Sequence, residues 1–361
     1  MGKLSKYQQV IEWVRKRMQN GELSAGDRLE SENELSAYFG ISRQTIRHAL
    51  ELLVREGVLE RRQGSGTYIK DTNASEEEKL ELSKTVTIVS TYVDGYIFPR
   101  ILQAMARELE KGGYGIQIMF TNNLLETERR LLLRLLEEKS RNPLIIEPVM
   151  SGIPNPNIKY YRRLKARGIP ILFFHSYYPE LDIPHVSMND EMAGRAATEY
   201  LIRHGHTKIG GIFKSDDGQG HRRYKGYLKA LLHAGIEIEE SRICWIDTQD
   251  VQSFSDIYPK VRKRFADCTA CVCYNDEVAH ELTEAQKDET WLGPEGISLI
   301  SVDNSELARL NSIPLTSVTH PMEALGQKAA EGIFKLIENP NANVTYEFPV
   351  NIVERESVGE G

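Results

Sequence analysis

The segment Leu29-Glu-Ser-Glu-Asn-Glu-Leu-Ser-Ala-Tyr-Phe-Gly-Ile-Ser-Arg-Gln-Thr-Ile-Arg-His-Ala-Leu50 contains start and stop signals for two consecutive helices. Ser31 and Glu34 are three residues apart, the spacing at which a hydroxyl and a carboxylate cap each other's backbone amides and open a helix. Gly40 suits the left-handed conformation that ends such a helix, and Ser42 can cap a second one. The segment therefore predicts two helices joined by a tight turn.

Both predicted helices separate apolar from polar side chains. The first is expected to turn Leu35, Tyr38 and Phe39 inward, and the second Ile46, Ala49, Leu50 and Leu53. The side chains left outside near the N-terminal end of the second helix are Arg43, Gln44, Arg47 and His48. Such a helix can enter the major groove of DNA, where Arg bonds bidentately to guanine and Gln to adenine.

The flanking residues supply the other parts of a winged helix-turn-helix. Residues 6–19 form an amphipathic helix, and residues 57–69 read as two short strands around a glycine-rich tip that can approach a phosphate. A helix-turn-helix alone also occurs in protein-binding domains, and a basic helix is often only a solvated face. The ordered set of helix, capped helix, turn, basic helix and glycine wing favours DNA binding.

At these residues the segment resembles the GntR-type winged helix-turn-helix, over residues 4–70. The matching pieces are residues 29–50 and Gln63-Gly-Ser-Gly-Thr67. The resemblance implies base contacts from Arg43, Gln44 and Arg47. It implies backbone-positioning contacts from Lys6, Tyr7, Glu32, Gln63 and Gly64. For Glu32 an intrahelical or solvated role stays open, because a carboxylate repels phosphate although it can accept from a cytosine amino group.

Charge is divided unevenly along the 361 residues, whose net charge is −7 at pH 7. Residues 1–70 hold 12 Lys and Arg against 9 Asp and Glu, a net +3, and the remainder holds 33 against 43, a net −10. This asymmetry is expected when only one part meets phosphates. Residues 71–84 carry five acids and two lysines, which predicts a solvated linker. We expect a DNA-binding domain at 1–70, a linker at 71–84 and a larger domain at 85–361.

The larger domain alternates apolar strand-like runs with helical ones. Strands are expected at 86–92, 116–120, 144–146, 171–174, 209–213, 243–246, 270–273 and 297–302, with helices at about 99–111 and 126–139. Such alternation with near-continuous apolar strands is typical of doubly wound parallel sheets. About ten strands exceed one sheet of usual size. We therefore predict an α/β fold in which two lobes enclose a cleft.

Polar residues recur where these strands end, and ligands in open α/β sheets bind outside the carboxyl ends of the strands. The candidates are Tyr96, Glu147, His175, Lys214, Asp216, Asn275, Asp303 and His320. Each alone could be a loop residue or a helix cap, as Asp276 is expected to be. Their recurrence predicts a site for a polyhydroxylated ligand, whose apolar faces would stack on rings such as those of Tyr96 and Phe98.

This domain resembles the periplasmic-binding-protein-like core of the LacI/GalR repressors over residues 85–355. The matching pieces are residues 205–211, 223–230, 275–279, 297–303 and 315–321. The resemblance implies effector contacts from His175, Arg223, Asn275, Asp303 and His320, with Phe98 packing on the ligand. Two departures matter. A GntR-type head replaces the family's own helix-turn-helix and hinge helix, and His320 stands where many relatives have glutamine.

A GntR-type head on a LacI/GalR-type body resembles the arabinose-responsive repressors. The strings that agree are residues 91–99, 145–148, 211–217 and 273–277. The resemblance implies a homodimer on double-stranded operator DNA, L-arabinose as the small-molecule effector and arabinose-utilisation genes as targets. A different pentose, a hexose or a nucleoside stays open as the effector, and no further cofactor is expected.

Other functions and sites fit the sequence less well. Cys268, Cys271 and Cys273 cluster, but residues 269–274 read as a buried strand, so buried thiols are expected rather than a metal site. A sugar-modifying enzyme could use Glu147 and Asp303 as acid and base, but the head would then be superfluous and no nucleophile or phosphate-loop motif is present. The charged N-terminus is unlike a secretory signal and no apolar run could span a bilayer, so we expect a cytoplasmic protein.

Overall fold

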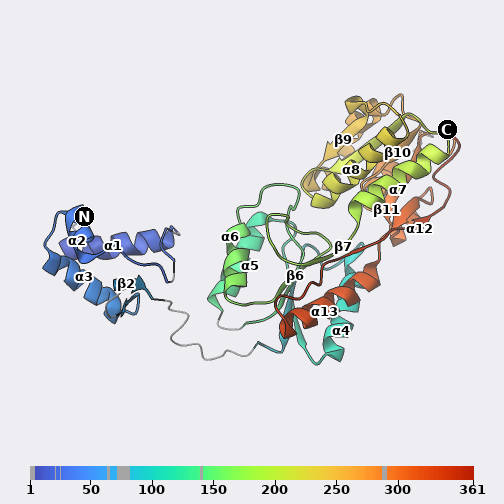
Figure 1. Cartoon of the computed structure of the whole chain (residues 1–361). Coiled ribbons are helices and arrows are strands. Elements are labelled where there is room, and N and C mark those ends of the chain that lie inside the picture. The colour runs from blue at the N-terminus through green and yellow to red at the C-terminus, as the bar shows by residue number, and fades with distance from the viewer. Residues whose placement is uncertain are drawn as a thin grey trace. The chain divides into compact units, whose positions relative to one another are not determined.

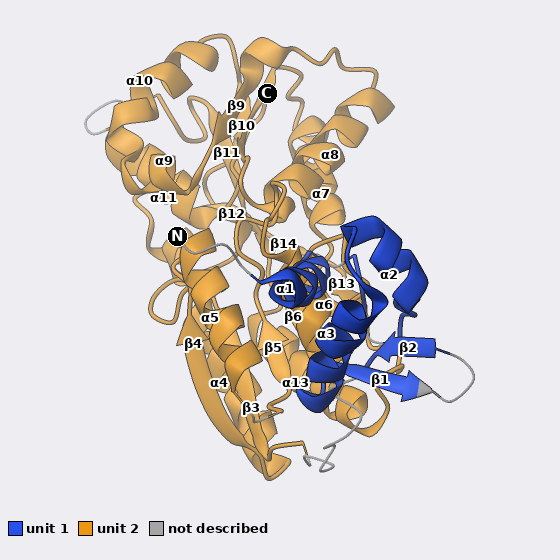
Figure 2. Ribbon diagram, turned by 90° about the vertical axis from the view of Figure 1, so that its left-hand side faces the viewer, with its two compact units in different colours: residues 1–80 blue, residues 81–361 orange. Residues whose placement is uncertain are grey.

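The structure is a computed structural model that describes residues 5–20, 22–24, 26–62, 66–70, 82–138, 141–286 and 291–361 (Figure 1). The chain separates into two compact units, Met1–Leu80 and Glu81–Gly361 (Figure 2). Of the helices in the described ranges, none combines the length and the apolar content that crossing a bilayer requires.

The first unit is a winged helix-turn-helix, as predicted. Its elements in chain order are α1 (Lys6–Gln19), α2 (Glu32–Phe39), α3 (Arg43–Arg55), β1 (Leu59–Arg62) and β2 (Gly66–Ile69), the two strands pairing antiparallel. The Ser31–Glu34 capping box forms in both directions, with hydrogen bonds of 2.7 and 3.3 Å. Gly40 is left-handed with φ 61°, and the Ser42 side chain accepts from the Thr45 amide at the start of α3. The sequence signals for both helices are therefore confirmed.

A small apolar core holds the three helices and the wing together. The predicted inward residues of α3 are all buried, as is Leu35 of α2. Tyr38 was expected on the same inner face, but its side chain is 70 % exposed. Its ring packs beside Trp13 at a centroid distance of 5.5 Å. The eight-residue helix α2 buries a narrow stripe around Leu35, and Tyr38 lies at the edge of that stripe.

The second unit contains two six-stranded sheets, which define a first and a second lobe. In the first lobe the strand order is β13-β7-β6-β5-β3-β4, and in the second β14-β12-β11-β10-β8-β9. The first-lobe strands are β3 (Thr85–Ser90), β4 (Gly115–Phe120), β5 (Leu144–Ile146), β6 (Ile171–Phe174), β7 (His185–Met188) and β13 (Tyr346–Phe348). The second-lobe strands are β8 (Ile209–Lys214), β9 (Ile243–Ile246), β10 (Ala270–Val272), β11 (Ser298–Asp303), β12 (Thr316–Thr319) and β14 (Ile352–Val353). All neighbours pair parallel except β12 and β14, which confirms the predicted two-lobed α/β architecture.

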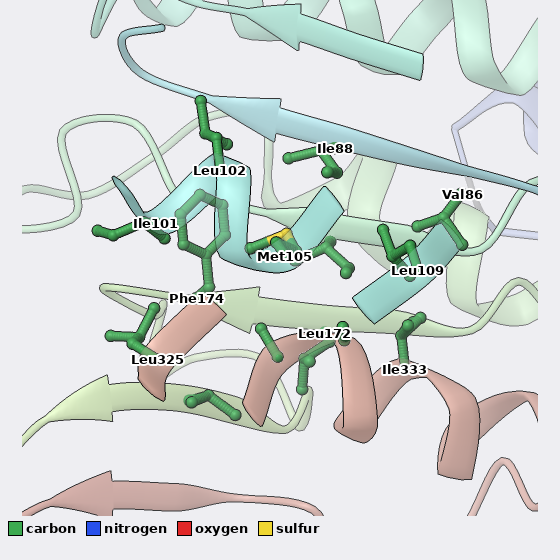
Figure 3. Packing of buried hydrophobic residues seen from close by; sticks show 14 of the residues in the cluster. Val86, Ile88, Ile101, Leu102, Met105, Leu109, Leu172, Phe174, Leu325 and Ile333 are labelled. Carbon is green, nitrogen blue, oxygen red and sulfur yellow. The ribbon is translucent and has the colours of Figure 1, made fainter. Parts of the chain in front are cut away.

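Helices cover both faces of the first-lobe sheet. Helices α4 (Phe98–Lys111) and α13 (Met322–Glu338) cover one face, and α5 (Leu125–Glu137) and α6 (Ile158–Ala166) cover the other. Because successive strand residues point to opposite faces, Ile88 packs toward α4 and α13 while Val89 packs toward α5 and α6. Figure 3 shows Ile88 and Leu172 of the sheet with Met105 of α4 between them.

The second lobe follows the same plan. Helices α7 (Asp190–Arg203) and α8 (Gly218–His233) pack on one face of its sheet. The helices on the other face are α9 (Thr248–Gln252), α10 (Phe254–Arg264), α11 (Asp276–Ala285) and α12 (Glu306–Leu310). The short 3-10 helix η1 (Glu240–Arg242) precedes β9. All four cysteines are buried free thiols, and three of them lie in or beside β10, as the strand assignment predicted.

The chain passes between the lobes three times, after β7, after β12 and between β13 and β14. Of the strands at these crossings, β7, β13 and β14 are two to four residues long and were not predicted from the sequence. Strands β7 and β13 mix polar with apolar residues, unlike the apolar runs of the equally short β5 and β6, and β14 has only two residues. Three crossings make the two lobes one unit while leaving a shared cleft between them.

Candidate DNA-binding face and effector cavity

The exposed side of α3 carries the polar residues that the sequence singled out. Arg43, Gln44, Arg47 and His48 are all exposed, whereas Ile46 and Ala49 between them are fully buried. Ser42 caps the helix directly before Arg43, so Arg43 and Gln44 lie exposed in the first turn of α3. This arrangement can enter a major groove.

Glu32 joins α2 to the exposed face of α3. Its carboxylate accepts from Arg47 Nε at 3.2 Å and from Arg47 Nη2 at 2.8 Å, and Arg61 Nη2 lies 3.6 Å away. Hydrogen bonds from Arg47 and the neighbouring positive charges hold the pKa of Glu32 below its ordinary value despite partial burial. Glu32 is therefore neither intrahelical nor simply solvated, since it orients Arg47 on the exposed face of α3.

The remaining candidates of the head lie at its periphery. Lys6 is exposed in the first turn of α1. Tyr7 is partly buried, and its ring meets that of His48 edge-on at 5.3 Å. Gln63 and Gly64 lie outside the described residues.

A cavity of about 260 Å³ lies between the two lobes of the second unit. Its walls come from residues that follow β3 to β6 in the first lobe and β8 to β11 in the second. Its volume equals that of about eight or nine water molecules. The predicted residues that line it are Tyr96, Phe98, Glu147, His175, Lys214, Arg223, Asn275 and Asp303. The structure thus brings together side chains that are up to 207 positions apart in the sequence.

Arg223 and Asp303 form one polar cluster in this cavity. Arg223 donates from Nε to Asp190 at 3.0 Å and from Nη1 to the Tyr274 carbonyl at 2.6 Å, and its Nη2 lies 3.5 Å from Asp303 Oδ1. Burial opposes the charge of Arg223, but the two aspartates more than offset it and raise its pKa. The Tyr96 hydroxyl, from the first lobe, donates to Asp303 Oδ2 at 2.6 Å.

Glu147 and two histidines form a second cluster. Glu147 Oε2 accepts from the amide and the hydroxyl of Thr91, both at 2.6 Å, and its Oε1 lies 3.9 Å from His175 Nε2. His175 Nδ1 and His320 Nε2 are 3.2 Å apart. Burial raises the pKa of Glu147 to about 7, and it lowers the pKa of His175 to about 4 and that of His320 to about 3. Both imidazoles are therefore neutral at pH 7, and one donates to the other.

Lys214 belongs to a third cluster on the second lobe. Its Nζ lies 2.7 Å from Asp217 Oδ2, which also accepts from the Tyr274 hydroxyl at 3.1 Å. Burial opposes the lysine charge, but Asp217 and Asp216 more than offset it and raise the pKa of Lys214. Both cations of the cavity, Lys214 and Arg223, therefore already have carboxylate partners.

Backbone strain gathers around the cavity. Four of its lining residues have left-handed φ angles although none is glycine: Tyr96 (53°), Asn123 (54°), His175 (64°) and Asp303 (105°). Non-glycine residues adopt such angles at a cost of about 1–3 kcal/mol each and do so mainly at functional sites. The strain supports the cavity as the binding site of this unit.

Two predicted effector residues do not line the cavity. Asp216 lies behind its wall, where Oδ2 accepts from the amide and the hydroxyl of Thr248 at 3.0 and 2.5 Å. His320 lies behind His175. In addition, the cap of α11 is Asn275 rather than Asp276, because Asn275 Oδ1 accepts from the Val278 amide at 3.0 Å. Asp276 is buried and accepts from Ser301 and Ser317 instead.

Sequence reasoning missed several polar residues of the cavity wall: Tyr92, Asn123, Asp217, Gln219, Thr248 and Tyr274. Tyr274 and Asp217 directly neighbour residues that were singled out, so taking every polar residue of each strand end would have found them. Gln219 lies in the first turn of α8, and its buried Oε1 has no hydrogen-bond partner among the described residues. Asn123 and Thr248 lie three and two residues beyond the predicted strands 116–120 and 243–246, whose ends supplied no candidate.

Two family models match the chain, one for each unit. Residues 6–69 match the bacterial regulatory proteins of the gntR family, and residues 198–358 match the periplasmic binding protein-like domain. Among solved structures, the transcription regulator CcpA of Lactococcus lactis superposes with a TM-score of 0.67 at 23 % identity, covering 76 % of this chain and 99 % of that one. A complex of the transcriptional regulator CelR with cellobiose has a TM-score of 0.68 at 19 % identity, covering 91 % of this chain and all of that one.

Fold and site together define a DNA-binding transcriptional regulator with a periplasmic binding protein-like domain. The chain is 34 % identical to the arabinose metabolism transcriptional repressors of Halalkalibacterium halodurans and Geobacillus stearothermophilus, in each case over 92 % of its own length and 90 % of theirs. It belongs to the family of the arabinose metabolism transcriptional repressors.

Proposed function

We propose that the inter-lobe cavity binds L-arabinose and that binding releases the protein from operator DNA of arabinose-utilisation genes. The observation that carries this proposal is the buried cavity of about 260 Å³ whose donors and acceptors come from both lobes. The two relatives at 34 % identity are named for arabinose metabolism, which supports this sugar among those that fit.

The charge balance of the cavity favours a neutral sugar. Lys214 and Arg223 are both paired with carboxylates, so neither offers an unneutralised charge to a phosphate or carboxylate ligand. Glu147 Oε1 and Asp303 can accept from sugar hydroxyls, whereas Arg223, Lys214 and Asn275 can donate to them. Phe98 and Tyr96 offer rings for the apolar face of the sugar. Asp216 and His320 would act from behind the wall by holding Thr248 and His175.

On the head, we assign base contacts to Arg43, Gln44 and Arg47, since these are exposed in the first turns of α3. Lys6, Tyr7, Gln63 and Gly64 would contact the DNA backbone and set the position of α3. Glu32 would act through Arg47. The boundaries at 1–70, 71–84 and 85–361 would then separate a reading head, a linker and a sensing body.

We further propose that the body forms a homodimer, so that two heads address two half-sites of one operator. The free edge of β4 supports this, because Ile118 and Phe120 there are 43 % and 54 % exposed, and bare apolar edge strands are interface features. Sugar-dependent release would correspond to a coupling of about 1–3 kcal/mol, or about 5- to 150-fold in operator affinity. Because operator DNA is the partner, the protein would act in the cytoplasm.

Operator binding with and without sugars tests the proposal. Full-length protein is titrated onto a labelled promoter fragment of the arabinose genes from the same genome, with L-arabinose, D-xylose, D-ribose, D-galactose or adenosine added. Release by L-arabinose alone is the expected result. Release by another of these compounds would support the repressor function but show that the effector is not L-arabinose. Unchanged operator affinity with all of them would overturn the proposal that the protein senses a sugar.

A further inference from the structure

Two cavity residues to which no sugar contact has been assigned, Asn123 and Thr248, face each other across the lobes. Asn123 follows β4 in the first lobe and Thr248 begins α9 in the second. Asn123 Nδ2 donates to Thr248 Oγ1 at 2.8 Å. Asn123 is 5 % exposed, so the bond is shielded from water on the first-lobe side. This hydrogen bond closes the space between the lobes at the wall of the cavity.

The bond is one link of a chain in which every group has a fixed role. The Met150 amide donates to Asn123 Oδ1 at 2.9 Å, which turns the amide so that its NH₂ faces Thr248. The Thr248 hydroxyl accepts a hydrogen bond from that NH₂ and donates one to Asp216 Oδ2 at 2.5 Å. Asp216 is 4 % exposed. A buried carboxylate thus anchors the second-lobe end, and a hydrogen bond to a charged acceptor is among the strong ones.

The backbones of the two lobes also approach closely beside this chain. The Gly152 amide of the first lobe donates to the Asp216 carbonyl of the second at 2.9 Å. A Cβ at position 152 would come within 2.7 Å of the Ser215 carbonyl oxygen and within 2.8 to 2.9 Å of backbone carbons of Asp217 and Asp216. Glycine is therefore required here only while the lobes are in contact.

This chain of hydrogen bonds lies beside the mouth of the cavity. The exposed residues of the lining are Asp94, Gly95, Gln252 and Glu277, and Gln252 ends the same short helix that Thr248 begins. A ligand larger than the cavity would have to extend toward these residues. A ligand that extended in this direction would have to separate the two lobes at the Asn123–Thr248 hydrogen bond and the contacts beside it.

We propose that Asn123, Thr248 and Asp216, with Gly152 beside them, form a latch that seals the cavity over a bound monosaccharide and excludes oligosaccharides. The inference rests on the proposed sugar site: the latch would set the maximum size of the sugar that this site accepts. The latch residues hold the two lobes to each other. Loss of the latch therefore speeds release of a monosaccharide and admits a longer ligand.

The test compares sugar binding by the full-length protein and three single variants. Thr248→Val removes the hydroxyl at nearly constant shape. Asn123→Asp replaces the donor by an acceptor, so that two carboxylates face one hydroxyl. Gly152→Ala inserts a methyl group between the lobe backbones. Thr198→Val is the matched control, since that buried hydroxyl donates to the Gly194 carbonyl within its own helix α7.

Calorimetry and stopped-flow displacement are run with L-arabinose, D-xylose, D-ribose and D-galactose, and with an arabinose disaccharide. For the monosaccharide that the wild type binds, each latch variant is expected to raise the dissociation rate about tenfold or more. The ratio of disaccharide to monosaccharide affinity should rise in the same variants and stay constant in Thr198→Val. Because Asn123 and Thr248 act as one unit, the double variant should be no weaker than the weaker single variant.

The outcomes separate the latch from the sugar site itself. A wild type that binds none of these sugars overturns both proposals. Wild-type binding with unchanged release in Thr248→Val and Gly152→Ala overturns the latch alone. Equal weakening of monosaccharide and disaccharide, with additive effects in the double variant, shows that the two residues merely touch the ligand and also overturns the latch.

Discussion

Glu32 at the start of α2 holds Arg47 of α3 with hydrogen bonds from both Nε and Nη2, the shorter of them 2.8 Å long. The arginine side chain is 52 % exposed and the glutamate 22 %, so the pair adds little to stability. Its effect is on orientation and charge. The recognition helix presents Arg47 in one position and with its charge partly neutralised before any DNA arrives.

Glu32→Gln should therefore lower the preference of the head for operator over unrelated DNA without destabilising its fold. Without the carboxylate, Arg47 and Arg61 are free to contact phosphates, so binding to unrelated duplex DNA should tighten severalfold. The logarithmic salt slope should steepen by about 0.9 for each additional phosphate contact, and the ratio of operator to unrelated affinity should fall. Glu12→Gln removes an equal charge from the exposed side of α1. Equal changes in the two variants would show that the effect comes from the net charge alone and not from the Glu32–Arg47 contact.

Arg43→Ala should weaken operator binding by about 1–3 kcal/mol and relax base preference at one position of each half-site. The reason is that Arg43 is the first residue of α3 and is fully available to a base edge. Arg55→Ala at the other end of the same helix, about 18 Å away along its axis, serves as the control. Binding curves on operators with single base changes measure both effects. Identical losses in the two variants would mean that only charge matters.

Gln219→Leu should separate stability from sensing. The Gln219 Oε1 atom is buried and has no hydrogen-bond partner in the described part of the chain, which costs about 1–3 kcal/mol. Leucine removes that cost, so the thermal midpoint should rise or stay, while sugar affinity should fall about tenfold. In Gln286→Leu the lost oxygen accepts from the Leu292 amide, so stability should fall and sugar affinity should not change. Parallel changes in the two variants would argue against Gln219 as a ligand contact.

The His175–His320 pair should make the second unit sensitive to acid. The folded protein holds the pKa of His175 at about 4 and that of His320 at about 3, both below the ordinary 6.5. The unfolded chain takes up these protons first as the pH falls. The stability gained by keeping the pair uncharged, about 3–5 kcal/mol for each group, is therefore complete above pH 6.5. It is lost as the pH falls to about 4 for His175 and to about 3 for His320.

His320→Gln should flatten this loss, because one of the two buried imidazoles no longer has to stay uncharged. Melting midpoints at pH 7, 6, 5 and 4 measure it. Glu147 acts in the opposite direction, since its folded pKa of about 7 lowers stability as the pH rises from about 4.5, but it is common to both proteins and cancels in the comparison. Parallel midpoint curves for the two proteins would refute the assignment to the histidines.

Much of the fold could be predicted because its signals are local. The Ser31–Glu34 box, Gly40 and Ser42 each satisfy or release backbone groups within four residues, so their outcome does not depend on distant parts of the chain. Tyr38 shows the limit. Helical spacing placed it inward, but the width of the buried stripe on α2 is set by what α1 and α3 supply.

The sequence by itself determined that polar residues end successive parallel strands, and parallel strands must bring those ends to one edge. That is why Glu147 and His175 lie at one edge of the first-lobe sheet and Lys214 and Asp303 at one edge of the second-lobe sheet. The two edges form a single cavity because the lobes face each other. Only the tertiary structure decided which neighbour at each strand end faces the ligand space. Asp216 turns away to anchor Thr248 while Asp217 beside it turns inward to Lys214 and Tyr274. Adjacent side chains point in different directions, and the partners that each finds within the second lobe decide between them.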